Sequence, residues 1–342
     1  MPIIQYNFMR VISIFAVVVL HSAAPMLSLY NSIPTTNWHI GNFYDSIVRW
    51  CVPVFFMLSG ALLLDPNKNE SIKHFFTKRL IKVIPPFIFW SLVFYVFANL
   101  ILGKNTIDAY IIIDFTKKFF TNGIYYHLWF VYVIIGLYIL TPLLRIFIKH
   151  SPKNMILYFL TIWFIGGPIA NYINYLFDIN IAFKPLFDIN VGYFVLGYYL
   201  RVTPLNKKTI SLIYLLGMLS LLITFFGTYF ETVANQGAFI GFYYDSISPN
   251  SVLVSIAVFV FIQNLKLPSK LNAPINFFSA SSFGVFFIHA LILDVFNIYL
   301  DFNPFTFLPL FSIPILAIVT FMVSTIIIHL LRKVKFIKTI IS

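Results

Sequence analysis

Long apolar runs are the feature of this sequence that most constrains its fold. A helix that crosses a membrane needs about 20 mostly apolar residues, and about ten such runs follow one another along the 342 residues. The runs are 8–29, 42–64, 83–102, 127–148, 155–174, 186–202, 209–230, 250–266, 280–300 and 307–331. Because they fill most of the chain, we expect one domain over residues 1–342, an all-α bundle of about ten transmembrane helices with no soluble domain. Strands of a membrane barrel would instead show short segments of alternating polarity.

The scarcity of charge supports this interpretation. Only 10% of the residues are charged and 60% are hydrophobic, whereas a soluble domain carries about 25% charged residues. This composition excludes a soluble enzyme, a disordered protein and a nucleic-acid-binding domain. The net charge of +12 does not indicate a nucleic-acid partner, because the basic residues cluster between the apolar runs. The single cysteine, Cys51, excludes a disulfide framework and a cysteine-built metal site, and we expect no bound metal or cofactor.

Lysine and arginine alternate between rich and poor connections. The rich ones are 65–82, 145–153, 201–208, 266–270 and the tail from 332, and the poorest are 30–41, 231–249 and 301–306. Because cytoplasmic loops carry the excess of Lys and Arg, both termini are predicted to be cytoplasmic. The first run resembles a signal peptide, but its removal would disturb this alternation, so we expect it to be retained.

The first run carries two ionisable residues on one helix face. Eleven helical steps separate Arg10 from His21, which is about three turns plus 20° and about 16 Å along the axis. An ionisable group within a membrane is a functional candidate by default. Arg10 at the cytoplasmic end is suited to hold a phosphate, and His21, deeper in the membrane, to move a proton near neutral pH. The alternative is a topology anchor and a packed histidine.

The second run opens with Asp45 and Arg49, which share one face of a helix. Pro53 and Gly60 within the same run predict a kinked helix that lines a cavity. Ser59 next to Gly60 allows a close approach of two helices. The alternative for Asp45 and Arg49 is a simple ion pair at the membrane interface.

Two further histidines lie in apolar runs. His127 and Trp129 begin the fourth run on the outer side, where an aromatic belt or a sugar platform is expected. His289 lies near the middle of the ninth run, and Asp294 is about 140° away around that helix, too far for a direct pair. The alternative role of His289 is a hydrogen bond between helices.

Basic residues before the third run complete the candidates. Arg79 and Lys82 share one face if the segment is helical, and they are suited to bind an anionic cytosolic ligand. The alternative is topology signalling or attraction to anionic lipid. The nucleotide-binding and hydrolase motifs G-x-x-x-x-G-K-[ST], G-x-G-x-x-G, H-E-x-x-H and G-x-S-x-G are absent from the sequence.

Taken in order, these elements resemble the membrane acyltransferase family 3. The resemblance is carried by N-F-M-R-V-I at 7–12, the Arg10 and His21 spacing, R-W-C-V-P at 49–53, F-F-M-L-S-G at 55–60, H-L-W-F at 127–130, T-P-L-L at 141–144 and F-I-H-A at 287–290. It covers nearly the whole chain and is nearest to the branch that O-acetylates surface polysaccharides such as enterobacterial common antigen. One departure is that the family's second cytoplasmic arginine is Lys82 here, which keeps the charge but loses the bidentate fork.

The resemblance implies a membrane O-acyltransferase of the bacterial cytoplasmic membrane. It would move an acetyl group from cytoplasmic acyl-CoA to a hydroxyl of a surface polysaccharide or a lipid-linked glycan. His21 would be the catalytic base, or would carry the acyl group covalently. Arg10, Arg79 and Lys82 would bind the donor, and Arg49, His127 and Trp129 the acceptor, with Asp45, Ser59 and His289 in support. The rival hypothesis is an exporter of polysaccharide or lipid-linked glycan that transfers no acyl group.

Overall fold

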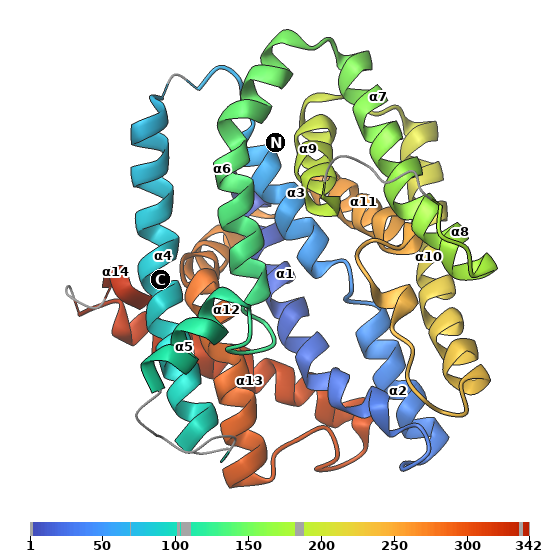
Figure 1. Ribbon diagram of the computed structural model, residues 1–342, viewed down its shortest axis with the longest axis vertical. Coiled ribbons are helices and arrows are strands. Elements are labelled where there is room, and N and C mark those ends of the chain that lie inside the picture. Colours follow the sequence, from blue (N-terminus) through green and yellow to red (C-terminus); the bar gives the residue numbers. More distant parts are fainter. Residues whose placement is uncertain are drawn as a thin grey trace.

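The structure is a computed structural model that describes residues 3–68, 70–100, 103, 111–181, 188–334 and 338–341. These residues form helices joined by connections, with no strand in the described ranges. The order (Figure 1) is α1 (Ile3–Ala23), η1 (Ala24–Leu29), α2 (Thr35–Ser46), α3 (Cys51–Leu63), α4 (Ile72–Leu100), α5 (Ile111–Phe120), α6 (Trp129–His150), α7 (Lys153–Phe164), η2 (Ile165–Ile169), α8 (Ala170–Phe177), α9 (Ile189–Val202), α10 (Lys207–Ala234), η3 (Phe242–Tyr244), α11 (Pro249–Asn264), η4 (Ser269–Leu271), α12 (Asn272–Leu300), α13 (Pro309–Leu331) and α14 (Lys338–Ile341). Helix α1 contacts α2, α3, α11, α12 and α13, so it forms the spine of the bundle.

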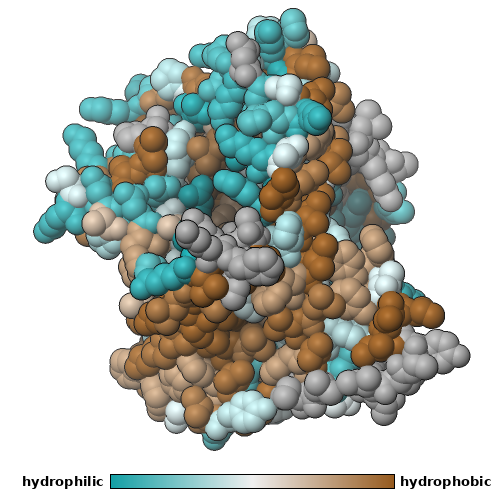
Figure 2. Space-filling view, turned by 90° about the vertical axis from the view of Figure 1, so that its left-hand side faces the viewer, coloured by the Kyte–Doolittle hydropathy of each residue, from teal (hydrophilic) through white to brown (hydrophobic). Residues whose placement is uncertain are grey.

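The surface of the bundle is suited to lipid. Nine stretches of the described residues are helical, long and apolar enough to cross a membrane. Helix α10 shows the apolar surface clearly, because Leu215, Met218 and Phe230 are 57%, 61% and 63% exposed. Figure 2 shows a hydrophilic surface at one end and a broad hydrophobic surface below it. The chain is therefore an all-helical integral membrane protein, as the apolar runs predicted.

The predicted second span is two helices rather than one kinked helix. Helix α2 ends at Ser46 and α3 begins at Cys51, with turns between them. Pro53 accounts for the break, because a proline is tolerated in the first turn of a helix but its ring clashes with the carbonyl four residues earlier, here that of Arg49. Residues 35–41, expected in a connection, are also helical. The break places Arg49 inside the bundle in a turn.

Three other segments differ from the prediction. Helix α4 begins at Ile72 and continues through Pro85 and Pro86, so most of the predicted basic loop 65–82 is helical. The fifth span contains a π-helical turn, η2, at its glycines and Pro168. The connection before residue 127 contains α5, whose exposed Ile112 and Phe120 are typical of a helix that lies on a membrane surface. The apolar pattern of the sequence located the apolar segments. It did not predict that helices would extend into polar residues or continue through prolines.

Helix α9 corresponds to the predicted sixth span, of which residues 186 and 187 lie outside the described ranges. Its 14 residues are fewer than a membrane crossing needs, and ten of them are buried. It packs closely on α3, where a Cβ added to Gly60 would lie 1.7 Å from the carbonyl oxygen of Phe194. The close helix approach predicted at Ser59 and Gly60 is therefore confirmed, with Gly60 at the contact.

We expect Gly60→Val to destabilise the bundle. The new side chain would force the backbones of α3 and α9 apart, and overpacking of this kind costs about 3 kcal/mol. Thermal unfolding of the detergent-solubilised protein, followed by tryptophan fluorescence, should show a clearly lower Tm. Gly136→Ala is the control, because nothing lies within 4 Å of a Cβ at that position. A Gly60→Val protein as stable as Gly136→Ala would show that the two helices do not touch there.

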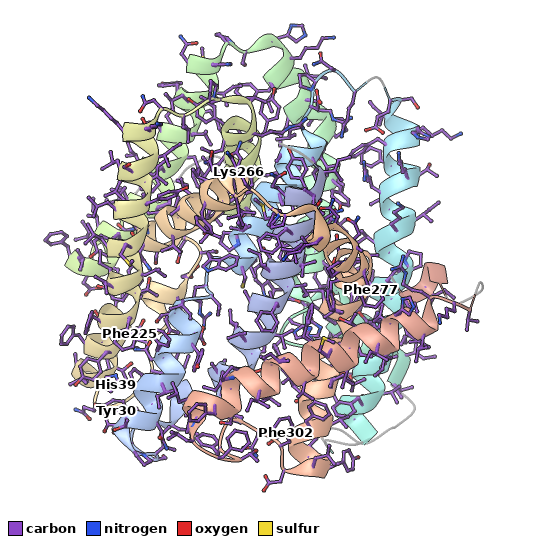
Figure 3. All side chains as sticks on the ribbon, turned by 180° about the vertical axis from the view of Figure 1, so that it is seen from behind. Tyr30, His39, Phe225, Lys266, Phe277 and Phe302 are labelled. Atoms are coloured by element: carbon purple, nitrogen blue, oxygen red, sulfur yellow. The ribbon has the colours of Figure 1, made fainter. Side chains whose placement is uncertain are left out.

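Basic side chains gather at one end of the bundle, which we call the basic end. It holds the connections at 64–68, 70–71, 151–152, 203–206 and 265–268, and Figure 3 shows Lys266 toward this end while Tyr30, His39 and Phe302 lie toward the other. We call that other end the opposite end. By the distribution of Lys and Arg, the basic end is predicted to face the cytoplasm.

Cysteine labelling tests this orientation. With Cys51 replaced by Ala, we introduce a cysteine at Asn67 of the basic end or at Asn235 of the opposite end, both of which are exposed. An impermeant thiol reagent applied to whole cells should label Asn235→Cys and should label Asn67→Cys only after permeabilisation. The reverse pattern would invert the predicted topology.

Candidate active site

Helix α1 carries the two residues that the sequence placed on one face. It is helical from Ile3 to Ala23, so Arg10 and His21 are separated by about 16 Å along its axis and by about 20° around it. Arg10 lies toward the basic end and His21 toward the opposite end. The predicted relation between the two side chains therefore holds in the structure.

His21 belongs to a group of three histidines. The ring of His289, on α12, stacks on that of His21 with centroids 5.3 Å apart. The ring of His127, immediately before α6, meets that of His289 edge-on at 5.2 Å. The Tyr126 ring covers His21 edge-on at 4.8 Å. We call His21, His127 and His289 the histidine cluster, which three separate parts of the chain bring together.

The members of the cluster differ in burial and hydrogen bonding. His289 is fully buried, and its Nδ1 lies 2.7 Å from the carbonyl oxygen of Phe286 and 3.1 Å from that of Val285. His127 is 3% exposed and packs edge-on against Phe94. His21 is only half buried. His21 is thus the least buried histidine of the cluster, and the other two are buried.

The loop before α6 is fixed to α12 beside the cluster. The Tyr125 hydroxyl donates a hydrogen bond to Asp294, so Asp294 pairs with this loop and not with His289, as its helix position predicted. Tyr126 is half exposed. Trp129 is half buried, and its ring contact is with Phe130. Tyr126, rather than Trp129, is therefore the aromatic ring next to His21.

Arg49 lies at the break between α2 and α3. It forms an ion pair with Asp45, which is fully buried, and its guanidinium lies 4.1 Å from the centroid of the Tyr244 ring. The guanidinium also lies within electrostatic range of His21. The pair predicted at the membrane interface is thus inside the protein, where a desolvated ion pair needs further partners. Ser59 is half buried one residue before Gly60, at the helix contact described above.

Arg10 is held by polar side chains of two helices. One guanidinium nitrogen donates to Ser279 at 3.0 Å and to Asn7 at 3.2 Å. Asn7 in turn donates to Asn276 at 2.9 Å. These contacts fix Arg10 between α1 and α12, and the Tyr138 hydroxyl is within its electrostatic range.

Further cations surround the basic end of α4. Arg79 lies within electrostatic range of Tyr138, as Arg10 does, whereas Lys82 is exposed one turn later. Arg145 forms an ion pair with Glu70 at 2.8 Å. Burial acts to raise the pKa of Glu70, but the hydrogen bond and charge of Arg145, followed by the charge of Arg79, lower it below its ordinary value. The carboxylate is therefore ionised at neutral pH.

A cavity of about 550 Å³ opens beside these cations. It is lined by Lys68, Glu70, Ser71, His74 and Lys78. The pKa of Lys68 is lowered first by its burial and then by the charges of Arg145 and Arg79. The lysines and arginines here outnumber the two carboxylates near Lys68, those of Asp65 and Glu70, which leaves the basic end suited to an anionic ligand.

No group of three or more His, Cys, Asp or Glu side chains in the described part of the chain has the geometry to hold a metal ion, and this applies to the histidine cluster as well. The chemistry available at the cluster is proton transfer and nucleophilic attack by imidazole.

Comparison with known proteins decides the family. The sequence model of the family described as an acyltransferase domain matches residues 3–329. The chain belongs to the membrane acyltransferase family 3. No curated protein and no solved structure matches it. It is therefore a multi-pass membrane acyltransferase, and the resemblance found in its motifs is confirmed at the level of the family.

Several neighbours of the candidate residues in this acyltransferase had no sequence signal. Tyr244 comes from a connection predicted to be an outer loop, and it reaches Arg49 only through the fold. The sequence indicates Arg145 only as one of the basic residues that mark topology, yet in the fold it pairs with Glu70. Ser279 lies at the polar start of α12, and its approach to Arg10 depends on the packing of α12 against α1.

Proposed function

We propose that this acyltransferase moves an acetyl group from acyl-CoA at the basic, cytoplasmic end to a hydroxyl of a surface polysaccharide or lipid-linked glycan in the bacterial cytoplasmic membrane. The observation that carries the proposal is the position of His21. It is the least buried histidine of the cluster and lies on the same helix face as Arg10. A donor anchored at Arg10 can therefore present its thioester deeper in the bundle.

The proposed donor site is the cationic region around Arg10 and Arg79. The phosphates of a nucleotide need charge-assisted hydrogen bonds, which guanidinium groups supply. Arg10 approaches from α1 and Arg79 from α4, and both lie within electrostatic range of Tyr138. Lys82 is proposed as a weaker, exposed contact, because an ammonium lacks the fork of a guanidinium.

The proposed chemistry is a direct transfer. Neutral His21 takes the proton of the acceptor hydroxyl while the oxygen attacks the thioester carbonyl and forms the new ester bond. The carbon–sulfur bond breaks, its electron pair leaves on the coenzyme thiolate, and the thiolate takes the proton from His21. General-base help of this kind is typically worth about 10²–10⁴ in rate. An acyl-histidine relay is the alternative sequence of steps.

The proposed acceptor site is the region of Tyr126 and Arg49. Tyr126 covers His21 edge-on while half exposed, so its remaining surface is suited to stack on a sugar ring. Arg49, held by Asp45 and Tyr244, supplies a fixed cation for the acceptor or for the charge that develops on the carbonyl oxygen. His127 and Trp129 support this site by packing rather than by exposed contacts.

Transfer in washed membranes tests the proposal. Membranes that contain the protein receive acetyl-CoA labelled in the acetyl group, and label in the glycan and glycolipid fractions is counted. Label should enter a hydroxylamine-sensitive ester in one of these fractions, and it should not do so with membranes that lack the protein. Export of a glycan without any incorporated label would favour the exporter hypothesis.

A further inference from the structure

The hydrogen bonds of Nδ1 fix the orientation of the His289 ring, and the proposed transfer assigns no role to this orientation. Both acceptors near its Nδ1 are backbone carbonyl oxygens, of Phe286 at 2.7 Å and Val285 at 3.1 Å. A carbonyl oxygen carries no proton, so Nδ1 must donate. In the neutral ring Nε2 then carries only a lone pair and can only accept a hydrogen bond.

Nε2 of His289 is buried and has no hydrogen-bond partner among the described residues. A buried acceptor without a donor is costly, and such a group in a native fold requires an explanation. A second proton on His289 would not resolve this, because it would place an isolated cation at a fully buried position in the bundle. A donor that turns toward Nε2 at another stage of the reaction would satisfy this acceptor.

Two imidazoles lie within reach, those of His127 and His21, and the ring nitrogens of His127 also lack a hydrogen-bond partner among the described residues. His21 is the one that the proposed transfer makes a cation, and a charged donor forms the stronger hydrogen bond. The rings of His21 and His289 are nearly parallel, at 27°, with centroids 5.3 Å apart. In-plane N–H groups of parallel rings do not point at each other, which explains the missing hydrogen bond. Ring nitrogens lie outside the ring centre, so a rotation of the His21 ring toward the plane of the His289 ring would bring their nearest nitrogens toward a hydrogen-bond distance of about 3 Å. His289 is fixed by its carbonyls, whereas His21 is less buried and its ring has no hydrogen bond to another described residue.

We propose that His289 is a positioning residue that accepts a hydrogen bond at Nε2 from His21 once His21 carries the acceptor's proton. This inference rests on the proposed function. One nitrogen of His21 takes the hydroxyl proton, and its other N–H donates to Nε2 of His289. When the thiolate takes the proton back, His21 is neutral again and the rings return to the stack. No proton is transferred to His289, so the charge balance of the reaction is unchanged.

Other ionisable groups face this pair and define its surroundings. They are His127 and Tyr126 before α6, Arg49 in the turn after α2, and Asp294 on α12. Asp294 is engaged by Tyr125 and Arg49 by Asp45. The field of Arg49 opposes a proton on His21, so a neutral acceptor oriented toward His21 offsets part of that cost.

Nitrogen NMR tests the inference without substrate. In the purified protein labelled with ¹⁵N-histidine, His289 should show a protonated Nδ1 and a bare Nε2, assigned by the loss of its signals in His289→Gln. When the pH is lowered until His21 is protonated, a coupling across an N–H···N hydrogen bond should join His21 to His289. A bare Nδ1, or a protonated His21 with no such coupling, would overturn the inference. Because this readout needs no turnover, it is independent of whether acetyl-CoA proves to be the donor.

Kinetics with acyl-CoA supply the second readout. His289→Leu should lower kcat about tenfold to a hundredfold, the range for one hydrogen bond to a charged group, with KM for acyl-CoA unchanged. His289→Gln keeps an acceptor oxygen near the position of Nε2 and should recover most of the rate. Leu and Gln variants that fold equally well and are equally slow, or that change KM rather than kcat, would assign His289 a packing role. Absence of acyl transfer by the unaltered protein would instead count against the proposed function.

Discussion

His21→Ala is expected to reduce acyl transfer by about 10²–10⁴-fold, the contribution typical of a general base, while the protein still inserts and accumulates. The reason is that His21 is the least buried member of the histidine cluster, whereas the other two members, His127 and His289, are buried. The measurement is the initial rate of label transfer from acetyl-CoA to the glycan fraction, normalised to the amount of folded protein. Binding of the donor should be nearly unchanged, because His21 lies about 16 Å from Arg10 along α1.

His329→Ala is the matched control for that experiment. His329 is also a half-buried histidine of a membrane-crossing helix, and its ring packs against Phe277 away from the cluster. Its replacement should leave the transfer rate within about twofold, since a substitution away from the site and outside the core has a small effect. Near-normal transfer by His21→Ala would remove His21 from the chemistry and would favour a packing role for all three histidines.

Arg10→Ala is expected to raise the apparent KM for acyl-CoA by roughly tenfold to a hundredfold. Loss of one charge-assisted hydrogen bond to a phosphate costs about 1.5–3 kcal/mol, and each 1.4 kcal/mol is about tenfold in affinity. The effect should be large because Ser279 and Asn7 hold the guanidinium in place, so little ordering is needed on binding. A binding titration of coenzyme A against the purified variant, paired with transfer rates, measures it.

Lys208→Ala serves as the control for charge alone. It removes one exposed cation from the same end, at the start of α10, without touching the Arg10 site. A surface charge of this kind is screened by salt and should change donor affinity by less than about twofold. Donor affinity that is equal in wild type and Arg10→Ala would contradict the donor site and would make Arg10 a topology anchor.

Much of the architecture followed from the sequence, because the features concerned are local. A run of about 20 apolar residues in a membrane must become largely helical wherever it lies in the bundle, since its backbone polar groups must be satisfied within the segment. The spacing of Arg10 and His21 fixed their shared face through the geometry of one helix. The break near Arg49 was missed as a boundary, although Pro53 gave a signal for some distortion, because the effect of a proline on a membrane helix depends on its neighbours.

The contacts between helices were decided only by the tertiary structure. His21, His127 and His289 lie more than 100 positions apart from one another in sequence, and Tyr244 reaches Arg49 from a connection with no motif. Apolar runs of similar composition do not specify which helix lies beside which, because lipid and neighbouring helices offer side chains nearly the same apolar surroundings. Close contacts such as Gly60 against Phe194, and polar ones such as Arg10 with Ser279, select one packing. The sequence therefore determined the membrane helices and their candidate residues, and the packing of small and polar side chains determined which of those residues meet.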